Sequence, residues 1–287
     1  MPTPCSIAEL PLMTELLDPR WGADLPATLG PLFARTDTNL LQSPDGSVVV
    51  YRNADLRALA GNRAVGNLPA PLLAAAFNMA TDGESRFQRL VANHVFTMNP
   101  PLHGPMRNLF AKQFMPGNVV RFAPIAETIV KELLGQACDR GEIDYVVEFA
   151  NVLAVRFWGE LIGLTPGEES TLTAMSEQIA PAFFLGRSEQ QTEAVERIAG
   201  EYLALVSGAI DRTLAVGTQP FLAEMAAALA SAEVDGKPAR IGLLLGAVLM
   251  DGFHTMAVGL ANVSYALLAN RAAHDRVRAE PSLVTAA

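Results

Sequence analysis

The sequence has few cysteines and no recognisable export signal. Its two cysteines, Cys5 and Cys138, stand far apart in the chain. This excludes a disulfide framework and a cysteine-rich metal site, and it fits a reducing compartment. The segment Met1–Leu17 contains Glu9 and prolines where a signal peptide would have a basic start followed by an apolar run. We therefore expect a cytoplasmic protein, and we assign no metal ligand.

Clusters of basic residues are also lacking. The formal net charge is -9, and the lysines and arginines are scattered along the chain. Binding to nucleic acid or to an anionic membrane needs a basic surface, so neither partner is expected. Half of the residues are hydrophobic, and 287 residues are enough to bury a sizeable core. The chain is therefore expected to be globular.

One long apolar run, Ile241–Asn270, carries a polar interruption from Asp251 to Thr255. As a helix the run would be about 45 Å long, enough to cross a whole domain. Asp251 and Thr255 lie four residues apart and share one face, with Gly252 beside them. A threonine hydroxyl within a helix can bond the carbonyl four residues earlier, here that of Asp251. The interruption would then present polar groups in an apolar wall, which suits a small polar molecule.

A membrane span is the alternative for this run, because its length and apolar content qualify. Asp251, His254, Asn262 and Ser264 would be costly against lipid, and no basic or aromatic belt frames the segment. No second candidate span exists. We therefore predict a buried central helix.

The rest of the chain is mainly helical in pattern. Leu40–Gln42 and Val48–Tyr51 flank a Pro-Asp-Gly turn, and they form the only clear strand pair. Apolar residues at spacings of three and four, bounded by turn residues, predict several helices. These are Met106–Phe114, Asn118–Cys138, Asp144–Leu164, Glu168–Phe184, Glu189–Ala215 and Phe221–Ala232. We find no linker or repeat, which predicts one domain over residues 1–287.

Two separated motifs resemble bacterial cytochrome P450 enzymes. The stretch Asn99-Pro100-Pro101-Leu102-His103, with Arg107 four residues later, resembles the Asp-Pro-Pro-x-His…Arg that opens their C helix. Gly252-Phe253-His254-Thr255 resembles the Gly-x-acid-Thr of their I helix. The order of the helices also fits, and the likeness runs from about Leu25 to Ala287. It implies a mainly α, cytochrome P450-like helical domain with a small N-terminal β element.

The resemblance assigns roles to these residues. His103 and Arg107 would hold the propionates of a b-type haem, and two donors one helical turn apart suit a carboxylate. A solvated helix start is the alternative for this pair. Gly252 and Thr255 would lie over the distal face of the haem, where oxygen binds and the threonine helps to deliver protons.

The motifs also depart from the family pattern. His254 stands where the family has an acid, and Asp251 stands where it usually has alanine. Histidine can relay protons near neutral pH, but it is bulkier than a carboxylate. Asp251 would replace the missing acid from one turn away, or else make a polar contact inside the fold. Both readings stay open.

The likeness ends at Glu280–Ala287, where the family's K helix would begin. The Glu-x-x-Arg pair and the loop whose cysteine ligates the iron have no counterpart in these residues. We expect Cys5 to lie in the N-terminal tail and Cys138 in a surface turn, so neither supplies the thiolate. Thiolate ligation tunes the iron for splitting the O–O bond. The domain is therefore expected to be incomplete at its C-terminus, and inactive alone.

Histidines offer another possible ligand to the iron. His274 lies among charged residues and is expected at a solvated helix end, and His94 is expected to be an exposed loop histidine. His254 would reach the iron from the distal side. Such ligation would give haem binding without monooxygenation.

The first hypothesis for function is therefore a haem-dependent monooxygenase completed by another polypeptide that supplies the thiolate. It would insert oxygen into a small or medium apolar molecule, with electrons from a ferredoxin or flavoprotein partner. Apolar residues in the family's substrate-contact regions fit such a substrate, although each is alternatively ordinary core. They are Phe87, Leu90, Phe96, Phe183, Phe184, Leu185, Leu244 and Val248. The second hypothesis is a catalytically inert helical protein that binds a ligand or partner through the surface left uncovered.

Overall fold

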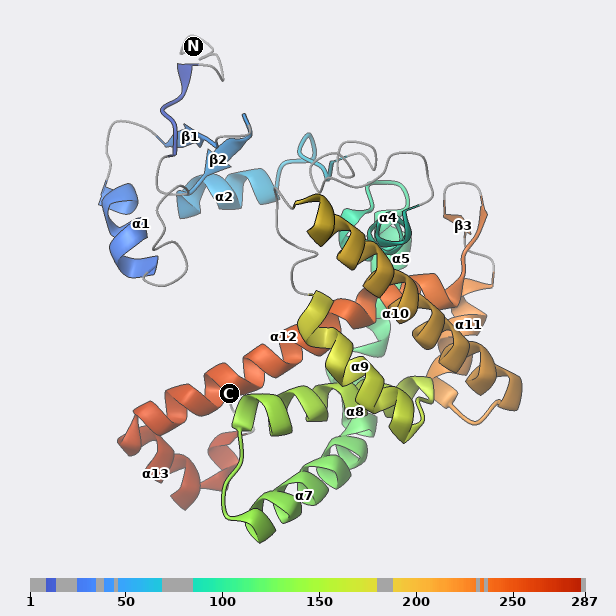
Figure 1. Cartoon of the computed structure of the whole chain (residues 1–287). Helices are drawn as coiled ribbons and strands as arrows, with labels where there is room; N and C mark the ends of the chain where they lie inside the picture. Colours follow the sequence, from blue (N-terminus) through green and yellow to red (C-terminus); the bar gives the residue numbers. More distant parts are fainter. Residues whose placement is uncertain are drawn as a thin grey trace. The chain divides into compact units, whose positions relative to one another are not determined.

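A computed structural model describes residues 9–13, 25–34, 39–43, 46–68, 85–179, 188–230, 233–234 and 237–284 (Figure 1). The chain divides into two compact units, Met1–Gly66 and Asn67–Ala287. We describe each unit by itself. The expectation of one domain over the whole chain stays a prediction.

In its described residues, the first unit combines a hairpin with two helices, α1 (Leu25–Ala34) and α2 (Asn53–Ala60). Strands β1 (Leu40–Gln42) and β2 (Val48–Val50) pair antiparallel, with Leu41 opposite Val49. Gly46 has a φ of 86°, which a glycine adopts at little cost. The small core of this unit gathers Met13, Leu32, Leu41 and Tyr51. The predicted hairpin is confirmed.

The second unit is almost entirely helical. Its elements are α4 (Arg86–Ala92), η3 (Val95–Thr97), α5 (His103–Gln113), α6 (Pro116–Val119), η4 (Val120–Phe122), α7 (Ala123–Arg140), η5 (Tyr145–Ala150), α8 (Asn151–Ile162), α9 (Pro166–Ile179), α10 (Glu189–Val216), α11 (Pro220–Leu229), β3 (Glu233–Val234), β4 (Lys237–Pro238), α12 (Ile241–Ala269), α13 (Arg271–Ala279) and η7 (Pro281–Val284). The predicted mainly α class is confirmed.

One expectation about strands was wrong. β3 and β4 form a second antiparallel pair, with Val234 opposite Lys237. Each of these strands has two residues. Segments this short cannot show an alternating pattern, so the sequence predicted no strands here.

The core of the second unit forms where α12 packs against α8 and α10. Small residues on α12 allow the close approach: a Cβ atom on Gly242 would lie 2.7 Å from the Ser207 Oγ. The buried Tyr202 hydroxyl of α10 donates a 2.7 Å hydrogen bond to the Gly246 carbonyl. α12 is long and apolar enough to cross a membrane, but half of its most apolar window is buried. Such burial is typical of a core helix.

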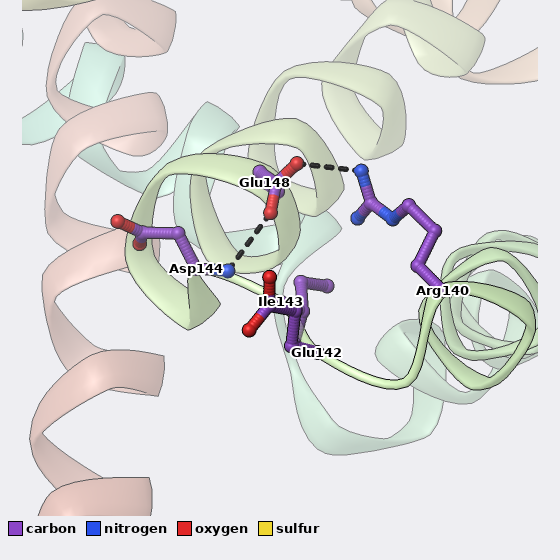
Figure 2. Close-up of a pocket in the computed structure, with 5 residues that line it drawn as sticks. All are labelled: Arg140, Glu142, Ile143, Asp144 and Glu148. Carbon is purple, nitrogen blue, oxygen red and sulfur yellow. Dashed lines mark hydrogen bonds and ion pairs between the residues drawn. The ribbon is translucent and has the colours of Figure 1, made fainter.

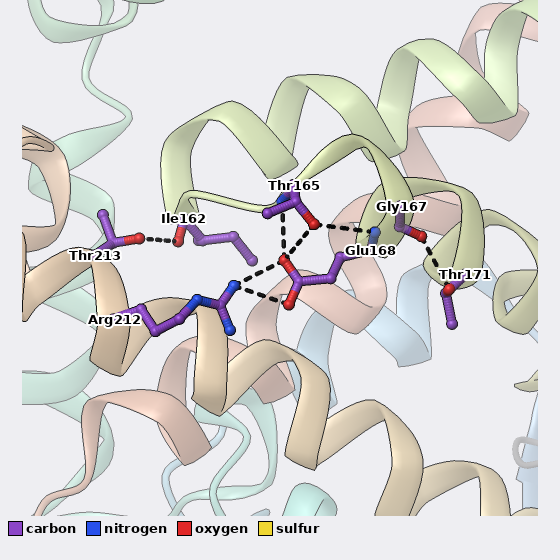
Figure 3. Close-up of polar contacts among 7 residues, drawn as sticks. All are labelled: Ile162, Thr165, Gly167, Glu168, Thr171, Arg212 and Thr213. Carbon is purple, nitrogen blue, oxygen red and sulfur yellow. Dashed lines mark hydrogen bonds and ion pairs between the residues drawn. The ribbon is translucent and has the colours of Figure 1, made fainter.

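The turn between α8 and α9 is fastened to α10 by polar contacts (Figure 3). The Thr213 hydroxyl of α10 donates to the Ile162 carbonyl at 3.1 Å. Thr165 and Glu168 form a reciprocal cap at the start of α9, and Arg212 of α10 donates to both oxygens of Glu168 at 2.8 and 2.7 Å. The pairing fixes the end of α8, the helix that packs against the middle of α12.

Candidate functional site

The polar interruption lies within a continuous α12. The Thr255 hydroxyl donates to the Asp251 carbonyl at 2.7 Å, which confirms the predicted bond. His254 and Thr255 are exposed, and 37% of the Asp251 side chain is accessible. The Thr255 hydroxyl proton is thus directed into the helix, while its oxygen lone pairs remain available.

Gly252 is needed for the approach of α8. A Cβ atom at this position would lie 3.0 Å from the Trp158 Nε1 and 3.1 Å from its Cε2. Any larger residue would therefore displace the indole ring. The predicted contact of Gly252 with a cofactor stays a prediction.

His94 is a site residue that the sequence analysis placed wrongly. It was expected to be exposed, but it is buried, with 7% of the residue accessible. Its Nδ1 accepts a 3.2 Å hydrogen bond from the Phe96 backbone N–H, and its ring packs on the Phe96 ring at 4.0 Å between centroids. Its Nε2 lies 2.9 Å from the Asp251 Oδ2. His94 thus connects the segment before α5 with the polar interruption of α12.

Tyr202 adds a fixed proton donor on the α10 side of this region. Complete burial raises the pKa of Tyr202 well above its usual value, and the nearby negative charge of Asp251 raises it further. The phenol therefore stays protonated at physiological pH. The Tyr202 hydroxyl donates its hydrogen to the Gly246 carbonyl.

The first turn of α5 carries the predicted anion grip. His103 is half-buried and Arg107 is exposed, one helical turn apart. Within the described part of the chain, neither side chain makes a hydrogen bond or an ion pair. Met106 and Phe110 of the same helix point into the core and anchor it. Two donors are therefore available to an anion from outside the chain.

The segment that leads into α5 is fastened by two asparagines. The Asn67 backbone N–H donates to the Asn99 side chain at 2.9 Å, and the Asn99 amide donates to the Asn67 carbonyl at 3.0 Å. The Asn67 side chain also donates to the Met98 carbonyl at 3.0 Å. Asn99, the residue that departs from the family's aspartate, thus fixes the backbone four residues before His103.

These residues fit a haem in chemical terms. A haem has two propionate carboxylates and a flat apolar ring. His103 and Arg107 are donors for carboxylates that have no side-chain partner among the described residues, and α12 exposes Val258 one turn beyond Thr255. Where bound, the haem would be held by the donors of α5 and covered by the polar interruption of α12.

The predicted substrate contacts are distributed differently. Phe87, Leu90 and Leu244 are buried in the main core, as the alternative reading of these residues stated. Val248 packs against that core and Phe96 is 52% exposed. Phe183, Phe184 and Leu185 lie outside the described residues. The substrate role of the set stays a prediction.

A cavity of about 340 Å³ lies elsewhere, between the end of α7 and the start of η5 (Figure 2). It is lined by Arg140, Glu142, Ile143, Asp144 and Glu148. Glu148 accepts hydrogen bonds from the Asp144 backbone N–H at 2.8 Å and from Arg140 at 2.7 Å, and these lower its pKa. Arg140 pairs with Glu148, and the Asp144 carboxylate caps the Val146 and Val147 N–H groups, so we do not take this cavity as the candidate site.

The chain is similar in sequence to bacterial oxygenases. It is 29% identical over 218 residues to the C-19 steroid 1alpha-hydroxylase of Sorangium cellulosum, a match that covers 72% of this chain and 53% of the hydroxylase. It is 26% identical over 211 residues to cytochrome P450 107B1 of Saccharopolyspora erythraea, covering 72% of this chain and 49% of that protein. The chain thus spans about half the length of these curated relatives. No family model matches the sequence.

Solved structures show the same fold. CalO2 superposes with a TM-score of 0.77 and 22% identity, over 96% of this chain and 66% of CalO2. The epothilone B-bound cytochrome P450epoK superposes with a TM-score of 0.73 and 21% identity, over 93% of this chain and 66% of that chain. The predicted resemblance to bacterial cytochrome P450 enzymes is confirmed in sequence and in fold, and relatives of this family imply a haem cofactor.

Proposed function

We propose that this partial-length relative of the bacterial cytochrome P450 enzymes supplies the distal part of a haem-dependent monooxygenase. The observation that carries the proposal is the pair of donors, His103 and Arg107. Their side chains have no partner among the described residues, and they lie in the same helical unit as the polar interruption of α12. A bound haem would supply oxygen activation. The reaction would be insertion of oxygen into a small or medium apolar molecule.

The site residues would have different roles. His103 and Arg107 bind the propionates and so orient the ring. The Thr255 hydroxyl donates its hydrogen to the Asp251 carbonyl, so its oxygen would accept a hydrogen bond and could orient a water. His254 is exposed beside it and takes the position of the family's acid. His254 would bring protons from solvent, because an imidazole both accepts and donates near neutral pH.

The thiolate would come from outside these 287 residues. Cys138 is exposed in the last turn of α7, far along the chain from both motifs. Cys5 lies outside the described residues. Beyond the polar interruption, α12 has an exposed apolar face made of Val258, Tyr265 and Leu268. We propose that the segment bearing the thiolate packs on this face, and that a ferredoxin or flavoprotein then delivers electrons.

A titration of haemin into the chain and its variants tests the proposal. Arg107→Leu removes one propionate donor and is expected to weaken haemin binding about tenfold, the effect of losing one charge-assisted hydrogen bond. Lys112→Leu removes the same charge from an exposed position of the same helix and serves as the matched control. It should bind haemin as the unchanged chain does. Equal loss in both variants would show that net charge alone matters.

The second hypothesis, an inert binding protein, predicts another result. In that case the unchanged chain would bind no haemin in a one-to-one ratio, and Arg107→Leu would change nothing. The exposed face of α12 would then serve a different partner.

A further inference from the structure

We infer that His94 and Asp251 form a clamp that holds the segment leading into α5 against the middle of α12. The inference rests on the proposed function, because it concerns how the two halves of the candidate haem site are kept in register. His94 follows α4, and nine residues later His103 begins α5. Asp251 opens the polar interruption of α12. The contact therefore joins the two motifs through side chains of the same unit.

The hydrogen bonding of the ring fixes its tautomer. The Nδ1 of His94 accepts the Phe96 N–H, so this nitrogen carries no proton. The ring proton is therefore on Nε2, which lies 2.9 Å from a carboxylate oxygen of Asp251. Nε2 is buried and makes no hydrogen bond in the described chain; its polar contact is the approach to the Asp251 carboxylate oxygen at 2.9 Å, whose geometry is not that of a hydrogen bond. A buried donor without a hydrogen bond is costly, so the polar attraction of Asp251 offsets part of that cost and stabilises the ring where it lies.

The same arrangement excludes a relay through the ring. A histidine passes a proton by taking it on one nitrogen and releasing it from the other. Nδ1 of His94 is occupied by a backbone amide, and Phe96 packs against the ring. His94 is therefore a positioning residue and not a catalytic one. The clamp therefore supports the reading of Asp251 as a polar contact inside the fold.

Nearby groups support this role. Ser85, which caps α4, and the Arg86 backbone N–H both donate to the Glu196 carboxylate of α10. The Thr97 hydroxyl, at the end of η3, donates to the Val91 carbonyl at 2.6 Å. The segment from α4 to η3 is therefore firm, and the clamp is its polar contact with α12. The position of this segment determines where α5 begins.

Distance measurement between spin labels tests the clamp in the chain without haem. Labels on Gly104→Cys, beside His103, and on Val258→Cys would report the spacing of the two motifs, in a background of Cys5→Ser and Cys138→Ser. A side chain at Gly104 would meet no atom within 4 Å, and Val258 is exposed. We expect one narrow distance distribution in the otherwise unchanged chain.

Paired substitutions separate the polar contact between His94 and Asp251 from the charge of Asp251 and from the volume of the ring. His94→Phe keeps the ring volume but removes the donor, and Asp251→Leu removes the acceptor; both should broaden or shift the distribution. His94→Gln keeps an N–H for Asp251, and Asp251→Asn keeps an acceptor while losing the charge; both should leave it narrow. Circular dichroism checks that every variant keeps its helices.

Two results would overturn the inference. One is the same distance distribution in all four variants, or a broad one in the parent. The other is a nitrogen-15 spectrum that places the His94 proton on Nδ1. Neither depends on haem, so a chain that binds no haemin but shows the clamp would contradict the proposed function alone.

Discussion

Gly163 is a single residue on which the packing of α8 behind the candidate site depends. It ends α8 with a φ of 77°, and a Cβ atom there would lie 1.9 Å from the Thr213 Oγ1. Either constraint alone favours glycine, and together they exclude other residues. The glycine thus allows α8 to end where α10 can hold it, and α8 carries Trp158 against Gly252.

Gly163→Ala is therefore expected to lower the free energy of unfolding by about 2 kcal/mol or more, through backbone strain and the clash with Thr213. Gly167→Ala is the matched control, because Gly167 lies in the first turn of α9 and a Cβ atom there meets nothing within 4 Å. It should be neutral or stabilise by about 0.5 kcal/mol. Urea denaturation measures both. Equal effects would contradict the account of Gly163.

The burial of His94 could not be predicted from the sequence. An Asn-His pair after a short helix has the composition of a surface turn, so the sequence indicated an exposed ring. Its burial depends on Asp251, which is 157 positions away and lies on another helix. Thr255 was predicted correctly because its partner is local, four residues earlier in the same helix. Contacts between distant segments leave no periodic signal.

At the scale of elements, most helices were predicted, and their ends were predicted best where a local capping signal marks them. α10 was predicted within one residue at its end, because Ser188 caps its start and Gly217 ends it with a positive φ. The start of α5 was predicted three residues late, since Pro101 and Pro105 interrupt the pattern. β3 and β4 were missed because they are held by pairing and not by composition.

The ion pair between Glu168 of α9 and Arg212 of α10 predicts how the stability of the fold depends on pH. Burial would raise the pKa of Glu168, but hydrogen bonds from Thr165 and Arg212 outweigh it and the pKa is lowered. A carboxyl whose folded pKa is depressed stabilises the fold above its unfolded pKa, and this contribution is lost as pH falls through the folded value. Glu168→Gln should therefore cost about 1 kcal/mol at pH 7 and progressively less below about pH 4.5.

Thermal unfolding from pH 7 to pH 3 would measure this difference between the parent and Glu168→Gln. Glu193→Gln, at an exposed position of α10 with no described ionic partner, is the control and should show no such trend. A Glu168→Gln penalty that stays constant with pH would show that the ion pair with Arg212 does not carry the effect.

At the scale of the whole molecule, the apolar face of α12 is the feature that needs a partner. Leu268 is 73% exposed and Tyr265 is 75% exposed. Exposed apolar side chains that share one side of a helix mark an interface or a site of aggregation. The face also explains why α12 passes the length and composition test for a membrane span while its first half is core.

The isolated chain is therefore expected to self-associate through this face. Leu268→Glu should shift the chain toward monomer, as measured by sedimentation velocity at several concentrations. Val216→Glu, at an equally exposed apolar position at the end of α10, is the matched control and should leave association unchanged. If both variants dissociate the chain alike, added negative charge is the cause and the face is not.

The central claim is that these residues supply the distal side of a haem site whose thiolate lies elsewhere. An absorption spectrum of the haemin-loaded chain, reduced under carbon monoxide, tests it most directly. We predict stoichiometric haem binding with a Soret band that is not of the thiolate type. A thiolate-type band would contradict the assignment of the thiolate to another segment, and failure to bind haemin would contradict the haem site itself.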